Sequence, residues 1–120
     1  MRKTYPKAAQ LAKTIGRELR VIREDKGYTQ EQVAAIVDLD RTTVGFFETG
    51  SANPSLMTFL AIAAALDVPA HKVIENAVSD FERRSEKKIR DVFGVTDAHV
   101  TRQLASLRKK KVGTAKKAKK

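Results

Sequence analysis

The side chains best able to do chemistry in this sequence are its lysines and arginines, which outnumber the acids by 24 to 14 and leave a net charge of +10. Such an excess indicates a polyanionic partner. Residues for catalysis are sparse, because cysteine is absent and the two histidines, His71 and His99, stand apart from each other and from any ligand-like spacing. No nucleophile–base pair, phosphate-binding loop or metal cluster stands out in the sequence, so we expect no enzymatic activity, no metal and no cofactor.

The charges are unevenly distributed along the chain. Residues 1–14 carry +4, residues 15–78 carry −3 and residues 79–120 carry +9. The positive ends therefore favour a polyanion, whereas the slightly acidic middle does not. Residues 108–120 hold eight basic side chains and almost nothing apolar, so we expect a disordered basic arm that contacts phosphates. A merely solubilising tail is the alternative.

The elements that must position these charges are helices. Apolar residues recur at helical spacing, and no segment alternates as a strand would. The first helix is expected to be capped by Thr4, to carry Pro6 in its first turn and to end at Gly27. Its apolar stripe comprises Ala8, Leu11, Ala12, Ile15, Leu19 and Ile22.

Two short helices follow. Thr29 and Gln32 match the capping-box pattern that opens a helix. Asp40 is placed to cap the next one, which we expect over residues 41–48 and which ends where Gly50 adopts a positive φ. The residues expected to face inward from these two helices are Val33, Ala34, Val37, Val44 and Phe47.

Two further helices are expected, one restarted by Pro54 and Ser55 and one opened by Pro69. The expected stripe of the fourth helix is Leu56, Phe59, Leu60, Ala63 and Leu66. The expected stripe of the fifth is Val73, Ile74, Ala77, Val78 and Phe81. The sequence therefore predicts an all-α fold.

The second and third helices have the geometry of a helix-turn-helix. They are short and joined by about four residues, and the later one has an apolar anchor in its middle. Ala34 lies where the two helices cross, and Leu39 and Val44 hold the turn and the underside of the later helix to the core. The outer face of residues 40–46 is thereby left free to enter a major groove, which admits one helix.

Residues 15–74 resemble the Cro and phage-repressor family, also called XRE-like helix-turn-helix proteins. The residues that carry the resemblance are Ile15-Gly16-Arg17-Glu18-Leu19-Arg20, Arg23, Gly27-Tyr28-Thr29-Gln30-Glu31-Gln32-Val33-Ala34, Val44, Glu48-Thr49-Gly50, Asn53-Pro54-Ser55 and Ile62-Ala63-Ala64-Ala65-Leu66-Asp67-Val68. The resemblance implies a five-helix, lambda-repressor-like domain that binds double-stranded DNA.

Roles for single residues follow from the resemblance. It implies that Gln30 and the backbone amide at the start of its helix hold a DNA phosphate. Arg41, Thr42 and Phe46 occupy the places where family members touch base edges, and Thr43 lies near the backbone. The full set expected at the DNA is Thr29, Gln30, Asp40, Arg41, Thr42, Thr43, Phe46 and Asn53.

Other positions match the family pattern structurally or depart from it. Arg23 and Glu48 match a largely buried salt bridge of family members. Asp38 replaces a usual glycine, and aspartate tolerates the left-handed conformation. Gly45 costs about 1 kcal/mol in a helix relative to alanine, unless it allows close approach to DNA. Phe46 has three open roles: contact with a thymine methyl, packing against a dimer partner, or covering its own domain.

Residues 89–112 resemble more weakly the helix-turn-helix of winged-helix regulators, with Gly94 at the turn and Thr96 as cap. Arg90 replaces the small residue expected at the helix crossing, and too little chain remains for a wing. Three alternatives stay open: a second DNA-contacting unit, a helical hairpin that dimerises or packs on the first domain, and partial disorder.

We therefore expect a basic segment (1–14), a helix-turn-helix domain (15–78), a helical extension (79–107) that dimerises or forms a second helix-turn-helix, and the disordered tail (108–120). The predicted function is a sequence-specific DNA-binding transcription regulator, a repressor acting as a homodimer on a two-fold symmetric operator. The alternatives are an antitoxin or mobile-element controller that binds a protein partner through residues 79–107, and a general nucleic-acid binder. No signal-peptide core or membrane span stands out, so a cytoplasmic location is expected.

Overall fold

A computed structural model describes residues 5–51 and 55–118, and these form seven helices and no strand. The predicted all-α fold is confirmed. The chain divides into two compact units, Met1–Lys87 and Lys88–Lys120. The first unit covers the predicted segments 1–14 and 15–78 together with residues 79–87 of the predicted extension.

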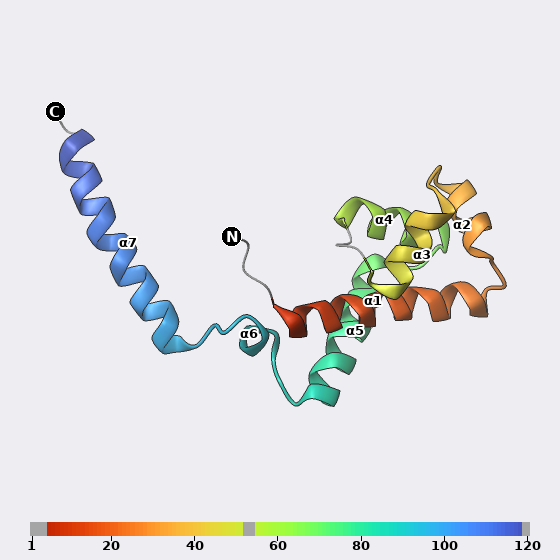
Figure 1. The fold of residues 1–120 in the computed structure, drawn as a ribbon, viewed down its shortest axis with the longest axis horizontal. Coiled ribbons are helices and arrows are strands. Elements are labelled where there is room, and N and C mark those ends of the chain that lie inside the picture. Colours follow the sequence, from red (N-terminus) through yellow and green to blue (C-terminus); the bar gives the residue numbers. More distant parts are fainter. Residues whose placement is uncertain (1–4, 52–54, 119–120) are drawn as a thin grey trace. The chain divides into compact units, whose positions relative to one another are not determined.

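The first unit contains five helices (Figure 1). They are α1 (Pro6–Asp25), α2 (Gln30–Ile36), α3 (Arg41–Thr49), α4 (Leu56–Ala65) and α5 (Ala70–Ser85). The long helix α1 packs against both α3 and α5, and α2 packs against α3. Helix α1 thus joins the helix-turn-helix pair α2–α3 to the rest of the unit.

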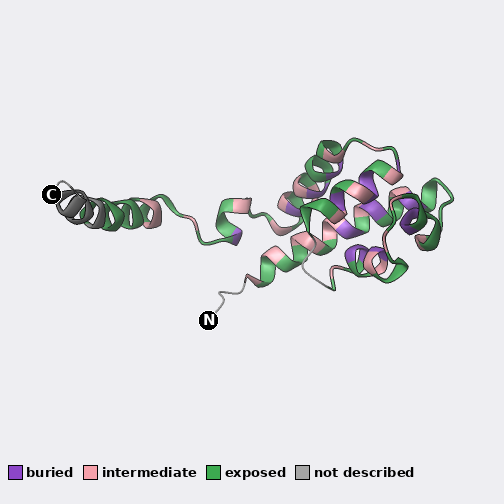
Figure 2. Cartoon of the chain, turned by 90° about the horizontal axis from the view of Figure 1, so that it is seen from above, coloured by how far each residue is buried: buried purple, intermediate pink, exposed green. Residues whose placement is uncertain are grey.

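The core lies where the inner faces of these helices meet (Figure 2). Leu19 from α1 and Val33 from α2 are fully buried, and the rings of Phe47 and Phe59 stack with centroids 6.0 Å apart. The core cluster comprises Leu19, Val33, Ala34, Val44, Phe47, Phe59, Ile62, Leu66 and Val73. Burial of this apolar surface is the main source of stability for such a unit.

The predicted stripe of α4 is partly wrong. Phe59, Ala63 and Leu66 are buried as expected, but Leu56 is 72% exposed and Leu60 is also exposed. Ile62, outside the predicted stripe, is fully buried instead. The reason is that α4 is apolar on every side, so the sequence shows no polar face from which the buried face could be inferred.

The helix starts agree with the sequence in part. Thr29 and Gln32 form the predicted capping box: the Gln32 backbone N–H donates to Thr29 Oγ1 (3.0 Å), and the Thr29 N–H donates to Gln32 Oε1 (2.9 Å). Asp40 is the N-cap residue of α3, yet its side chain makes no capping hydrogen bond. Thr4 lies outside the described residues, and the N-cap residue of α1 is Tyr5.

Helix ends in both units use one kind of turn. At the ends of α1, α2, α3 and α4, and at Gly94 in the second unit, one residue has a positive φ, and the N–H of the following residue donates to the carbonyl five positions earlier. In the α2–α3 turn, Asp38 has φ 56° and the Leu39 N–H lies 2.8 Å from the Ala34 oxygen. The same turn occurs at Gly27-Tyr28, Asp67-Val68 and Gly94-Val95. The prediction that aspartate tolerates this conformation at residue 38 is confirmed.

The second unit consists of α6 (Ile89–Val92) and α7 (Asp97–Ala118). Thr96 caps α7 by accepting from the His99 N–H at 3.0 Å, and Arg90 pairs with Asp97 at 3.2 Å. Every side chain from Thr101 to Lys109 is exposed (Figure 2).

The prediction of a disordered tail from residue 108 is wrong as far as Ala118, because α7 continues to that residue. Lysine and alanine are good helix formers and dominate residues 108–118, which contain no proline. Gly113, with its neighbours Val112 and Thr114, weakens the helix without ending it. The low apolar content of this segment suggested disorder. A segment with few apolar residues cannot pack into a core, but it can still form a helix on its own.

No single helix among the described residues is long and apolar enough to cross a membrane. Helices α4 and α5 are together long and apolar enough, but the chain bends by 111° between them.

Candidate nucleic-acid interface

Helix α3 has an inner face that anchors it and an outer face left free. Val44 and Phe47 are buried in the core, next to Val33 and Ala34 of α2. Arg41 and Thr42 are exposed, and Phe46 is 51% exposed. A short helix held rigidly from beneath in this way presents its outer side chains in fixed positions.

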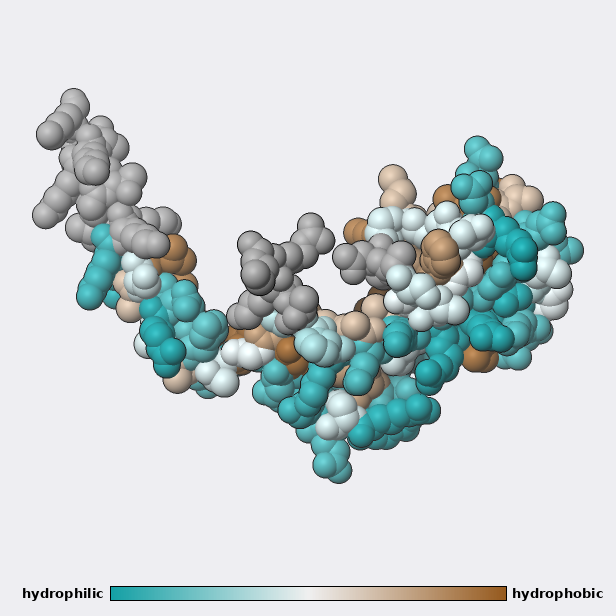
Figure 3. All heavy atoms as spheres, in the orientation of Figure 1, coloured by the Kyte–Doolittle hydropathy of each residue, from teal (hydrophilic) through white to brown (hydrophobic). Residues whose placement is uncertain are grey.

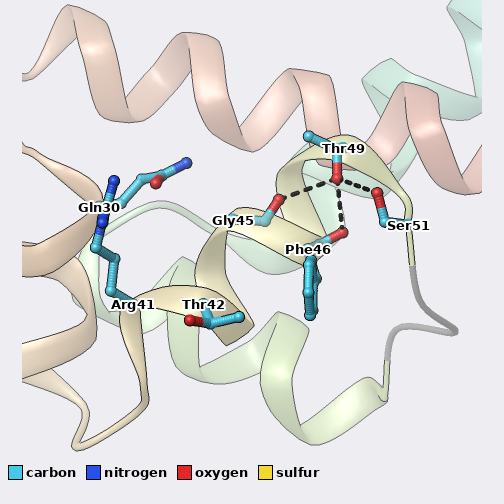
Figure 4. A pocket seen from close by; sticks show the side chains of 7 residues that line it. All are labelled: Gln30, Arg41, Thr42, Gly45, Phe46, Thr49 and Ser51. Carbon is cyan, nitrogen blue, oxygen red and sulfur yellow. Dashed lines mark hydrogen bonds between the residues drawn. The ribbon is translucent and has the colours of Figure 1, made fainter.

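The outer face of α3 is hollowed into a groove of about 450 Å³ (Figure 4). Arg41 extends toward Gln30 on one side of Gly45, and the Phe46 ring lies on the other side. The Thr49 hydroxyl lies 3.1 Å from the Gly45 carbonyl oxygen and 2.6 Å from the Ser51 hydroxyl. The residues that line the groove are Gln30, Arg41, Thr42, Gly45, Phe46, Thr49 and Ser51.

Four of the residues expected at the DNA meet in this groove: Gln30, Arg41, Thr42 and Phe46. The others lie elsewhere. Thr43 is half-buried and does not line the groove, Thr29 is engaged in the capping box, and Asp40 is exposed at the start of α3. Asn53 lies outside the described residues.

Phe46 is 51% exposed. A ring that lies flat on its own domain buries one face and exposes the other, so this exposure fits all three roles considered for Phe46: covering its own domain, contact with a thymine methyl, and packing against a partner molecule.

The Arg23–Glu48 ion pair is present beneath α3. Arg23 Nε donates to Glu48 Oε2 at 2.6 Å and Arg23 Nη2 to Glu48 Oε1 at 3.1 Å. The two side chains are 10% and 1% exposed, and Arg23 Nη1 also donates to the Tyr28 carbonyl oxygen at 2.7 Å. Hydrogen bonding to the Glu48 carboxylate raises the pKa of Arg23. Removing one partner of such a buried pair typically costs about 3–5 kcal/mol, because the other charge is left uncompensated.

The same carboxylate also positions Gln30. Gln30 Nε2 donates to Glu48 Oε1 at 3.0 Å. An amide nitrogen has two hydrogens, so one remains for a ligand outside the domain. Gln30 therefore links the buried ion pair to the groove, a structural role that the sequence did not indicate.

Gly16 is a second position whose role was missed. A Cβ at Gly16 would overlap the Phe47 carbonyl oxygen and would lie 2.7 Å from the Glu48 carbonyl oxygen and 2.9 Å from its carbonyl carbon. Helix α1 thus contacts the backbone at the end of α3 directly. The signal was available, because a glycine inside a 20-residue helix is costly unless close approach requires it.

Comparisons with known proteins agree with this geometry. The Helix-turn-helix family model matches residues 19–73. The chain is 42% identical to the restriction-modification controller protein C.AhdI from Aeromonas hydrophila, covering 54% of this chain and 97% of that one with a TM-score of 0.50. The clp gene regulator ClgR from C. glutamicum shares the fold at 24% identity, covering 58% of this chain and 91% of that one, with a TM-score of 0.55.

A curated relative is the immunity repressor protein of Bacillus phage phi105, 29% identical over 82 residues. The match covers 63% of this chain and 57% of the repressor, so the chain spans little more than half the length of that relative. The chain belongs to the XRE-like helix-turn-helix family.

Proposed function

We propose that the protein represses transcription by binding as a homodimer to a two-fold symmetric operator. The observation that carries the proposal is the groove on the outer face of α3, which gathers Gln30, Arg41, Thr42 and Phe46 on a rigidly anchored helix. Helices of this kind enter the major groove with their N-terminal residues toward the base edges.

The exposed side chains suit base recognition. A guanidinium donates two parallel hydrogen bonds to guanine O6 and N7, which makes Arg41 the candidate for a guanine contact. The Thr42 hydroxyl donates or accepts, and the Phe46 ring suits a thymine methyl. The N-terminus of α2 and the free Gln30 amide hydrogen suit a phosphate.

Dimer formation is supported by an uncharged, exposed apolar surface on α4. Leu56 and Met57 are 72% and 77% exposed, and the sequence has no charged residue between Glu48 and Asp67. Hydrophobic side chains reach the surface over α3 and α4 (Figure 3). Two copies of an uncharged face meet without like-charge repulsion, and a two-fold axis pairs two copies of α3 with two half-sites.

Repression rather than activation is the direction favoured by the relatives. The phage phi105 protein is called an immunity repressor, whereas C.AhdI is called a controller of a restriction-modification system. A dimer seated on an operator excludes other proteins from the same DNA, which is sufficient for repression.

Replacing Arg41 by alanine tests the proposal. We expect a loss of about 1–3 kcal/mol in operator binding, because a bidentate guanine contact is lost. Affinity for random DNA should fall far less, and Lys72→Ala, which removes an exposed cation from α5, should leave the operator preference unchanged. Equal losses on operator and random DNA would make Arg41 a phosphate contact and would contradict the proposal.

A further inference from the structure

One face of α1 carries a row of three cations. Lys13, Arg17 and Arg20 follow a spacing of four and then three residues, which places them on the same side of a helix. All three are exposed, and together with Glu48 and Thr49 they line a cavity of about 250 Å³.

The cation row adjoins the groove on α3. Thr49 lines both cavities. A Cβ at Gly50 would lie 3.1 Å from Lys13 Cα, so the row begins directly beside the residue that ends α3.

The charges in the row are largely uncompensated. Within residues 5–51 and 55–118, neither Lys13 nor Arg17 has a side-chain hydrogen bond or an ion pair, and Arg20 has only an exposed contact with Glu24 at 3.5 Å. The one acid in the cavity, Glu48, is already occupied by Arg23 and by Gln30. The local field beside the α3 groove is therefore positive.

We propose that Lys13 and Arg17, with Arg20, bind phosphates of the DNA strand that flanks the bases contacted by α3. This inference rests on the proposed function, and it names a phosphate-binding surface that the sequence did not indicate. The row extends over about 10 Å of helix axis, which fits a strand with a phosphate every 3.4 Å of rise or so better than a single small anion. The net charge of the first unit is only +1 over residues 1–87. The row of three cations concentrates positive charge at one place on this nearly neutral unit.

The test compares two charge-matched double variants of the full chain. Lys13→Gln with Arg17→Gln removes two cations of the row, and Lys72→Gln with Arg83→Gln removes one lysine and one arginine from α5, outside both cavities. Binding constants are measured by fluorescence anisotropy on the operator and on a random duplex at several salt concentrations. Because glutamine keeps the first two methylene groups of each stem and all four positions are exposed, both variants should melt within a few degrees of the parent.

For the α1 variant, we expect the slope of log binding constant against log salt to fall by about 1.8, from about 0.9 for each phosphate neutralised. Affinity for both duplexes should fall by a similar factor, because phosphate contacts carry no direct sequence information. The α5 variant should lose less than half as much slope. Equal slope changes in the two variants would overturn the inference. The proposed function fails by a separate result, namely a parent protein that prefers no operator over random DNA.

Discussion

At the scale of single residues, the glycine at position 45 of α3 is the residue whose presence helix stability cannot account for. Glycine disfavours a helix interior, and Gly45 has no need of a positive φ or of a close contact inside the domain. The nearest atoms to a Cβ placed there belong to the Gln30 side chain, at 3.6 Å, which is an ordinary contact distance. The glycine opens the middle of the groove between Arg41 and Phe46, where a base edge would approach α3 (Figure 4).

Gly45→Ala should therefore stabilise the free protein and weaken operator binding. The free energy of unfolding should rise by about 0.5–1 kcal/mol, from the lower backbone entropy of alanine in the unfolded chain. Operator affinity should fall because a methyl group occupies the groove, while random-DNA affinity changes little. Thermal melts and anisotropy titrations measure both quantities. A more stable variant with unchanged operator affinity would show that the glycine does not serve close approach.

At the scale of elements, the contact between α1 and α3 holds the helix-turn-helix in place. The helices approach so closely at Gly16 that the Phe47 carbonyl oxygen, with the Glu48 carbonyl group beside it, occupies the space of a Cβ. The Arg23–Glu48 ion pair joins the same two helices about two turns further along α1. Any movement of α1 away from α3 would therefore disturb the position of Glu48 and, through it, of Gln30.

Gly16→Ala should separate α1 from the end of α3. Overpacking of this kind typically costs about 1–3 kcal/mol, and backbone atoms on the α3 side cannot move aside as a flexible side chain would. Arg17→Ala, the neighbouring exposed position, is the control and should change stability by less than about 0.5 kcal/mol. Denaturant unfolding measures both variants. A Gly16→Ala protein as stable as the control would mean that the two helices are not held this closely.

Local sequence features predicted the helices and turns better than they predicted which helix faces are buried and which side chains bind one another. The turns were predictable because each combines a left-handed residue, an apolar residue and an N-cap, as in Gly27-Tyr28-Thr29. The buried face of α4 was not, because Leu56 and Ile62 are equally apolar and only tertiary packing distinguishes them. The Gln30–Glu48 hydrogen bond joins residues eighteen apart, and no local spacing indicates it.

At the scale of the whole molecule, charge and recognition are divided between the two units. Residues 1–87 hold thirteen basic and twelve acidic side chains, whereas residues 88–120 hold eleven basic and two acidic ones. The first unit carries the groove on α3, and the second carries a net charge of +9. We expect the second unit to supply affinity and the first to supply sequence preference.

Deletion of residues 108–120 tests this division. If about half of its eight cations reach phosphates, the slope of log binding constant against log salt should fall by roughly three to four. The preference for operator over random DNA should change little. An unchanged slope would leave the segment as a solubility device. A selective loss of operator preference would instead favour a second sequence-specific unit at residues 89–112, the role considered for the weaker helix-turn-helix resemblance there.

Selection of bound fragments from random DNA, followed by sequencing, tests the central claim most directly, because it reports the operator motif, its symmetry and the contribution of α3 together. For the full chain we expect a two-fold symmetric motif whose half-sites are centred about one helical turn apart, 10–10.5 base pairs or so, with a guanine in each half-site. Selection with the Arg41→Ala protein should lose the preference for that guanine and keep the rest of the motif. An enriched motif without symmetry would contradict the homodimer. Absence of any motif, or a guanine preference that survives Arg41→Ala, would contradict recognition of the operator by the outer face of α3.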